Sequence, residues 1–328
     1  KKYKDAEIFA ITISKKYPNH SFSWKVLGSI YNEIGRSSDS LNANQMAIKI
    51  NPNDHEVYNI SGIIYQKLNR FSEAKECFKK ALLLNPRYIE AHNNLGVVQQ
   101  ITGRLNDAKN SYKEAIKLNP GYAEAHYNLG NIYKENVRLD KSINIYKKAI
   151  NLKPNYPEAF CNLGVVYQKT GNFEGAEESY NQAIKLKANY STALINRSKL
   201  FFEKRDFNTA LTDADSCETG ESRICSLESL YALGRIDEIY KRIDKYSKID
   251  EKNIRVSSFA AFISEKEKKN VANNFCLDPL SFLYFNNLSS CINDSDKFII
   301  DFTKDLYELK ADWEPDTKTT RRGFQTPN

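Results

Sequence analysis

Small and aromatic residues recur along the chain with a fixed step of 34 residues. One column holds glycine, at positions Gly28, Gly62, Gly96, Gly130 and Gly164. Sixteen residues later comes a mostly aromatic column, and three residues beyond it every repeat has an alanine. Small residues allow two helices to approach closely, and rings fill the space beside them. The pattern therefore predicts a repeated pair of antiparallel helices.

The ends of these helices are also marked in the sequence. Gly35, Gly103 and Gly171 fall between the two helices of their repeats, where a left-handed residue commonly ends a helix. The second helix of four repeats is followed by a proline, which stops it: Pro52, Pro86, Pro120 and Pro154. One helix pair cannot bury its apolar face alone, so the pairs are expected to stack into an all-α solenoid.

The segment EAHYNLGNIYKENVRLDKSINIYKKAINLKPNY resembles a tetratricopeptide repeat in its period and in each of these columns. The resemblance implies a right-handed superhelical solenoid of antiparallel helix pairs. We expect residues 1–20 to form the second helix of a truncated repeat, so that Lys1 is not the natural start. Residues 21–190 are expected to form five full repeats and residues 191–269 a degenerate repeat with capping helices.

An asparagine stands two residues before the glycine position in four successive repeats: Asn94, Asn128, Asn162 and Asn196. These side chains are expected to form an amide ladder on the first helices, which line the concave groove of such arrays. An amide can both donate to and accept from a peptide backbone, so the ladder could hold an extended chain. The ladder resembles that of O-linked N-acetylglucosamine transferases. The alternative, that each amide only satisfies a neighbouring group, stays open here.

Asn131, Lys134 and Gln168 complete the predicted peptide-binding groove. No catalytic residue and no metal ligand is predicted. His92 and His126 share a column with Trp24, Tyr58 and Phe160, which favours packing over metal binding.

Charge and cysteine content narrow the class of partner. The net charge of +7 comes from 48 basic and 41 acidic residues that are interspersed along most of the chain. This is typical of a solvated surface, so a protein or peptide partner is expected rather than nucleic acid. The six cysteines include no Cys-x-x-Cys pair, which favours free thiols and a cytoplasmic location. No apolar stretch is long enough to predict a membrane span.

From about residue 270 the pattern changes. Asp278-Pro279 breaks the helical run, a strand-like stretch is expected over 280–285, and SDKFIIDFTKDLYEL predicts an amphipathic helix. Segment 270–328 resembles the start of an Fe(II)/2-oxoglutarate oxygenase, a jelly-roll-like second domain, here truncated. The matching residues are Phe275, Cys276, Pro279, Leu280, Trp313, Pro315, Thr319, Thr320, Gly323, Gln325 and Thr326.

The oxygenase resemblance implies an iron held by a His-x-Asp motif and a distal histidine. The chain has no histidine after His126, so Fe(II) and 2-oxoglutarate are implied only for residues beyond Asn328 and no cofactor is expected in this chain. Three functions remain open: a substrate-recruiting arm of such an oxygenase, the arm of a glycosyltransferase resembling O-linked N-acetylglucosamine transferase, or a scaffold without an enzyme.

Overall fold

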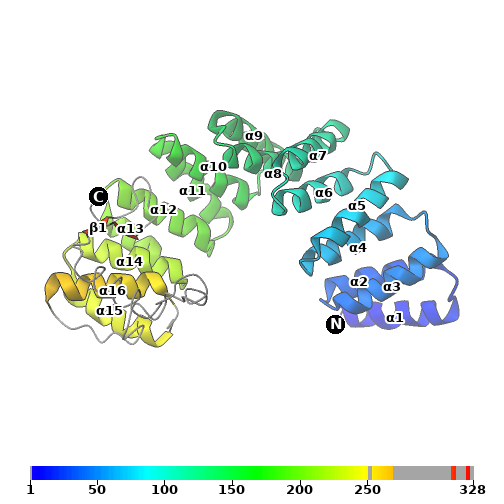
Figure 1. The fold of residues 1–328 in the computed structure, drawn as a ribbon, viewed down its shortest axis with the longest axis horizontal. Coiled ribbons are helices and arrows are strands. Elements are labelled where there is room, and N and C mark those ends of the chain that lie inside the picture. Colours follow the sequence, from blue (N-terminus) through cyan, green and yellow to red (C-terminus); the bar gives the residue numbers. More distant parts are fainter. Residues whose placement is uncertain (1, 250–252, 269–311, 315–322, 326–328) are drawn as a thin grey trace, which may run out of the picture. The chain divides into compact units, whose positions relative to one another are not determined.

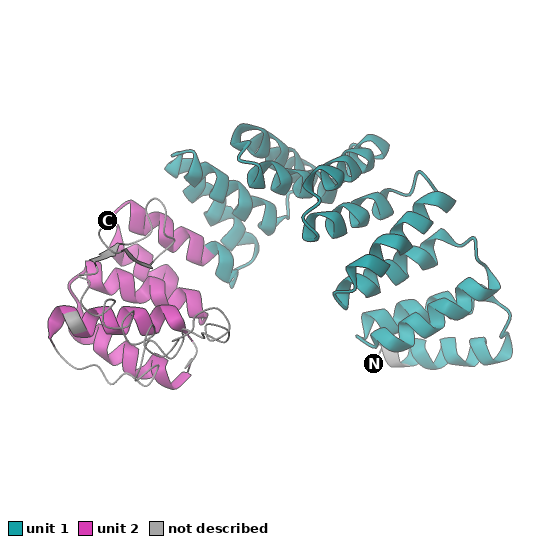
Figure 2. Ribbon diagram, in the orientation of Figure 1, with its two compact units in different colours: residues 1–193 teal, residues 194–328 magenta. Residues whose placement is uncertain are grey.

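The computed structural model describes residues 2–249, 253–268, 312–314 and 323–325 (Figure 1). The chain divides into two compact units, residues 1–193 and 194–328 (Figure 2). All of the regular structure described between residues 2 and 268 is helical.

The first unit is a solenoid of helix pairs. Each pair packs against the next in chain order, so that every helix contacts its neighbours in the sequence. The pairs are α2 with α3, α4 with α5, α6 with α7, α8 with α9 and α10 with α11, and α1 packs on α2. Their bounds are α1 Lys2–Lys16, α2 Ser21–Glu33, α3 Ser37–Ile50, α4 His55–Lys67, α5 Phe71–Leu84, α6 Ile89–Ile101, α7 Leu105–Leu118, α8 Ala123–Glu135, α9 Leu139–Leu152, α10 Pro157–Lys169 and α11 Phe173–Leu186.

From the second repeat to the fifth, the repeat glycine lies against the aromatic ring sixteen residues later in the same helix pair. A Cβ atom added to Gly130 would lie 2.6 Å from Cε1 of Tyr146, and Gly62, Gly96 and Gly164 meet their rings at the same distance. Tyr146 is fully buried, as are the rings at the matching positions of the neighbouring repeats. The ring also joins side chains of the next pair, because Tyr146 clusters with Leu163 and Val166 of α10. Any side chain at the glycine would displace the ring that binds successive pairs together.

The turn between the two helices of a pair requires a left-handed residue in every repeat. Gly35, Gly103 and Gly171 have φ values of 80°, 75° and 78°, as the sequence predicts. The equivalent residues of the other repeats are Asn69, Val137 and Arg205, whose φ values of 58°, 55° and 61° place them in the same region. The conformation is therefore imposed by the packing of the pair and not only by glycine.

The second unit contains shorter and less regular elements. Its helices are α12 Ser191–Glu203, which begins in the first unit, α13 Phe207–Asp215, α14 Gly220–Ala232, α15 Ile236–Ile249 and α16 Ile254–Glu267. α13 has only 9 residues, against 14 in α11. Val256, Phe259, Ala260 and Ile263 form an apolar stripe on α16 that is fully buried.

Two short strands are described near the end of the chain. β1 (Asp312–Glu314) pairs antiparallel with β2 (Gly323–Gln325), and Trp313 stands opposite Phe324 in the register. The strand expected over 280–285 and the helix expected over 295–309 lie outside the described residues. The jelly-roll-like domain therefore stays a prediction.

Candidate functional site

The first helices of successive repeats form one continuous surface in the first unit. α2 contacts α4, α4 contacts α6, α6 contacts α8 and α8 contacts α10, although each belongs to a different repeat. We call this surface the first-helix face. The predicted residues Asn94, Asn128, Asn131, Lys134, Asn162 and Gln168 all lie on its helices, while Asn196 lies on α12 in the second unit.

The asparagine ladder links each repeat to the one before it. Nδ2 of Asn94 donates to Oδ1 of Asn59 at 3.1 Å. One repeat later, Nδ2 of Asn128 donates to Oδ1 of Asn93 at 2.9 Å. In both cases the acceptor lies 35 residues earlier, on the preceding first helix. An amide carries two N–H groups and two acceptor lone pairs, so each of these asparagines has an N–H and its carbonyl oxygen left for another partner.

Asn162 is used differently from the two asparagines before it. Its Nδ2 donates to the hydroxyl of Tyr127 at 3.0 Å and to Oδ1 of Asn131 at 2.9 Å. Its Oδ1 accepts from Nζ of Lys134 at 3.2 Å. Both N–H groups of Asn162 are therefore occupied within the protein, and its main effect is to hold Lys134 in place.

Lys134 brings a charge into this otherwise neutral row of amides. No carboxylate lies within ion-pair distance of its ammonium group in the part of the chain that the structure describes. Burial and the nearby ammonium group of Lys169 lower the pKa of Lys134. A partly desolvated ammonium group with one weak acceptor favours the binding of an anionic group from a partner.

A second row of polar contacts connects the first-helix face to the buried aromatic column. The hydroxyl of Tyr180 donates to Oε1 of Gln168 at 3.0 Å, and the hydroxyl of Tyr112 makes the same bond to Gln100. The hydroxyl of Tyr146 donates to Oδ1 of Asn131 at 2.5 Å. Burial raises the pKa of Tyr112 and Tyr146, so these two hydroxyls stay protonated and donate. These hydrogen bonds from the buried tyrosines fix the orientation of the Gln168 and Asn131 side chains.

The sequence interpretation missed Gln100 and the tyrosine hydroxyls. The signal was present, because the position four residues after the repeat glycine holds Gln66, Gln100, Lys134 and Gln168 in successive repeats. Tyrosine replaces phenylalanine in the aromatic column from the third repeat onward, which adds a hydroxyl at each step. A polar column of this kind, paired with a new hydroxyl, indicates a hydrogen bond between the two helices.

The histidines of the repeats have structural partners. Nε2 of His92 bonds to the carbonyl oxygen of Pro86 at 3.0 Å, and Nε2 of His126 bonds to that of Pro120 at 3.0 Å. The indole N–H of Trp24 donates in the same way to Pro18 at 2.9 Å. These contacts tie the start of a first helix to the preceding turn. No group of three or more His, Cys, Asp or Glu side chains in the described residues could hold a metal ion. These residues thus do not offer the donor set of an Fe(II) site.

Family models identify the repeats of the first unit. The tetratricopeptide repeat matches at residues 55–88, 77–110 and 157–190, and a further model of the same repeat matches at 101–137 and 138–171. Residues 55–190 are tetratricopeptide repeats. A search of curated proteins gives no match to the chain. Every helix that the structure describes is too short or too polar to cross a membrane.

Solved structures share the same fold. The chain is similar to the APC/C hetero-tetramer Cut9–Hcn1, with a TM-score of 0.63 and 14% identity over 70% of this chain and 46% of that one. It is also similar to PilF of Pseudomonas aeruginosa, with a TM-score of 0.54 and 20% identity over 60% of this chain and 91% of that one. YrrB, a tetratricopeptide repeat protein described as having an unusual peptide-binding site, matches with a TM-score of 0.45 and 21% identity, over 56% of this chain and 95% of that one. At such identities, the first two comparisons show the fold alone.

Proposed function

We propose that the tetratricopeptide repeats bind an extended polypeptide along the first-helix face, and that the bound segment carries an acidic group opposite Lys134. The main support is that the asparagines of this column differ in how many of their hydrogen-bonding groups are used within the protein. Asn94 and Asn128 each keep an N–H and an acceptor oxygen, at the same position of successive repeats. A peptide backbone presents C=O and N–H groups that such amides can bind whatever the side chains of the peptide are.

The acidic group follows from the charge of Lys134. Its ammonium group is partly buried, and one amide oxygen is its acceptor at 3.2 Å. A carboxylate from the bound peptide would supply the missing acceptor and the opposite charge, and charge-assisted bonds are about twice as strong as neutral ones. The amides would then set affinity for any extended chain, while Lys134 would select the sequence.

Selection from a random twelve-residue peptide library displayed on phage would test this proposal. A selected peptide is made with a fluorescent label and titrated with the full chain by fluorescence anisotropy. Asn94→Ala combined with Asn128→Ala is expected to weaken binding about tenfold, because several hydrogen bonds of about 0.5–1.5 kcal/mol are lost. Asn106→Ala combined with Asn110→Ala is the matched control, since both are exposed on α7, the second helix of a pair.

The acidic preference has its own control pair. Lys134→Met is expected to remove the preference for peptides with Asp or Glu, whereas Lys113→Met, at an exposed position on α7, should leave it intact. Circular dichroism establishes that each variant is folded. If the Asn94 and Asn128 double variant is folded and binds the selected peptide with unchanged affinity, the first-helix face is not the binding surface.

We further propose that the repeats recruit a substrate for an Fe(II)/2-oxoglutarate oxygenase domain. The support is the sequence resemblance of residues 270–328, with the iron ligands coming from residues other than those of this chain. Mass spectrometry of a partner captured in cells distinguishes the alternatives. A gain of one oxygen atom that depends on 2-oxoglutarate supports the oxygenase, and a hexosamine adduct supports a glycosyltransferase arm. An unmodified partner supports a scaffold and leaves the peptide-binding proposal standing.

A cytoplasmic location is part of the same proposal. It is supported by free thiols at Cys77, Cys161, Cys217 and Cys225, which fit a reducing compartment.

A further inference from the structure

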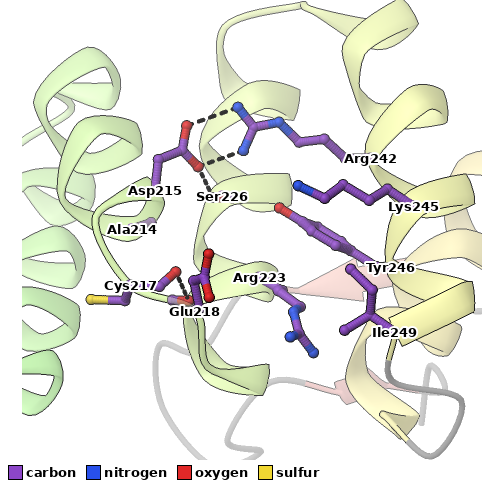
Figure 3. A pocket seen from close by; sticks show the side chains of 11 residues that line it. Ala214, Asp215, Cys217, Glu218, Arg223, Ser226, Arg242, Lys245, Tyr246 and Ile249 are labelled. Carbon is purple, nitrogen blue, oxygen red and sulfur yellow. Dashed lines mark hydrogen bonds and ion pairs between the residues drawn. The ribbon is translucent and has the colours of Figure 1, made fainter.

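A cavity of about 460 Å³ lies in the second unit. It is open to solvent and is lined by the end of α13, the turn that leads into α14, the first half of α14 and one side of α15 (Figure 3). Its size falls within the range of about 300–1,000 Å³ that is usual for small-molecule sites. The polar residues that decide its chemistry are Asp215, Glu218, Arg223, Arg242, Lys245 and Tyr246.

One wall of the cavity is an internal ion pair. The guanidinium group of Arg242 donates two hydrogen bonds to the carboxylate of Asp215, one of them at 2.8 Å, and Ser226 Oγ donates a third. Burial alone would raise the pKa of Asp215, but the bonds from Arg242 and Ser226 hold it below its ordinary value. Asp215 therefore stays ionised and paired, and the wall contributes no net charge.

Three further charged side chains line the cavity. Arg223 and Lys245 are cationic, and Glu218 is the one carboxylate besides Asp215 among the lining residues. Lys245 and Glu218 have no ion-pair or hydrogen-bond partner within the described ranges 2–249 and 253–268. Arg223 lies over the ring of Tyr246, with its guanidinium carbon 5.7 Å from the ring centre. The cavity thus combines an excess of positive charge with one separate acceptor.

The donors approach the cavity from different elements. Figure 3 shows the side chains of Lys245 and Tyr246 extending from α15 toward the turn that carries Glu218, while Arg223 comes from α14. A phosphate group has three terminal oxygens and accepts hydrogen bonds from several directions at once, which suits an ammonium and a phenol on α15 together with a guanidinium on α14. A single carboxylate would use fewer of these donors.

We propose that this cavity binds a small organic phosphate whose other end carries an ammonium or hydroxyl group. The phosphate contacts Lys245, Arg223 and the hydroxyl of Tyr246, and the donor at the other end meets the carboxylate of Glu218. The proposal concerns the second unit alone and does not depend on peptide binding by the repeats.

Calorimetric titration of the full chain at low ionic strength tests the proposal with two probes, phosphoethanolamine and inorganic phosphate. Phosphoethanolamine should bind more tightly, because its ammonium group can meet Glu218. Lys245→Glu should weaken both probes about tenfold or more, since a charge-assisted donor becomes a repelling carboxylate. Lys241→Glu is the matched control: it makes the same charge change on α15 at an exposed residue that does not line the cavity.

Glu218→Gln tests the second half of the site. It should remove the preference for phosphoethanolamine over inorganic phosphate while leaving inorganic phosphate bound, because only the acceptor for the ammonium group is changed. Glu218 is exposed and not part of the core, so the variant is expected to fold. The proposal is overturned if neither probe gives saturable binding, if both bind equally, or if Lys241→Glu weakens them as much as Lys245→Glu.

Discussion

Asn44 stands where the later repeats have a buried aromatic ring, and replacing it with phenylalanine should stabilise the first repeat. Its side chain is 1% exposed, and neither Nδ2 nor Oδ1 has a hydrogen-bond partner. It lies against Gly28 as Phe78 lies against Gly62 in the next repeat. The glycine that makes room for a ring is thus present, but the ring is not.

The size of the effect follows from three contributions. Removing a buried polar group that lacks a partner recovers about 1–3 kcal/mol. Burying a phenylalanine side chain adds about 1.5–3 kcal/mol, and fitting the larger ring between α2 and α3 costs about 1–3 kcal/mol of repacking. We expect Asn44→Phe to raise the free energy of local unfolding by about 2 kcal/mol.

Hydrogen exchange measured by mass spectrometry is the suitable assay, because repeat arrays open locally and need not unfold in one step. Amides of α2 and α3 should exchange about 30-fold more slowly in the variant, which corresponds to about 2 kcal/mol. The reverse change Phe78→Asn should speed exchange in α4 and α5. Unchanged or faster exchange in Asn44→Phe would refute the reasoning, since it would mean that the space beside Gly28 is not shaped for a ring.

Three further predictions concern other features of the fold. Val137→Gly should raise thermal stability by about 1 kcal/mol, because a β-branched residue is strained at φ 55°, and Asn69→Gly at the matching turn should give less. Burial lowers the pKa of His126 below 6.5. The free energy of unfolding should therefore be highest above that pH and fall below it, by at most about 1.4 kcal/mol per pH unit. In urea unfolding measured between about pH 7.5 and 5, His126→Phe should reduce this dependence of the free energy on pH. Arg197→Met should cost about 3–5 kcal/mol by leaving the buried Asp213 unpaired, and adding Asp213→Leu should restore most of the loss in a double-mutant cycle.

The fold of the repeats could be predicted because most repeats have a glycine or a proline at a helix end. Pro86 marked the end of α5, and Gly103 and Pro120 marked the two ends of α7, with Gly103 at the left-handed turn between α6 and α7. The same turn at Val137 carried no local signal. There the packing of α8 on α9 imposes a conformation that valine does not favour, so only comparison with the neighbouring repeats would have revealed it.

The helix positions of the asparagine column follow from the period of the sequence, but the hydrogen bonds of these asparagines do not. The period places Asn94, Asn128 and Asn162 at equivalent positions of their helices, and in the structure they lie at equivalent positions of α6, α8 and α10. Which atom each amide contacts depends on the register between adjacent first helices, which no single repeat encodes. Asn128 meets an asparagine of the preceding repeat, whereas Asn162 meets Tyr127 and Asn131. The residue 35 positions earlier is an asparagine for Asn128 and a tyrosine for Asn162, so the same column position has different hydrogen-bond partners in successive repeats.

The bonds between repeats bear directly on how the first-helix face could bind. An amide with no internal partner would rotate freely and lose side-chain entropy when a peptide ordered it. Asn94 and Asn128 are already held by Asn59 and Asn93, so most of that entropy is lost on folding and not on binding. The contact that looks purely structural therefore prepares the remaining acceptor oxygen for a ligand. Hydrogen bonding between repeats and peptide binding are thus compatible roles for this asparagine column. The bond to the preceding repeat favours peptide binding, because it orders the amide in advance.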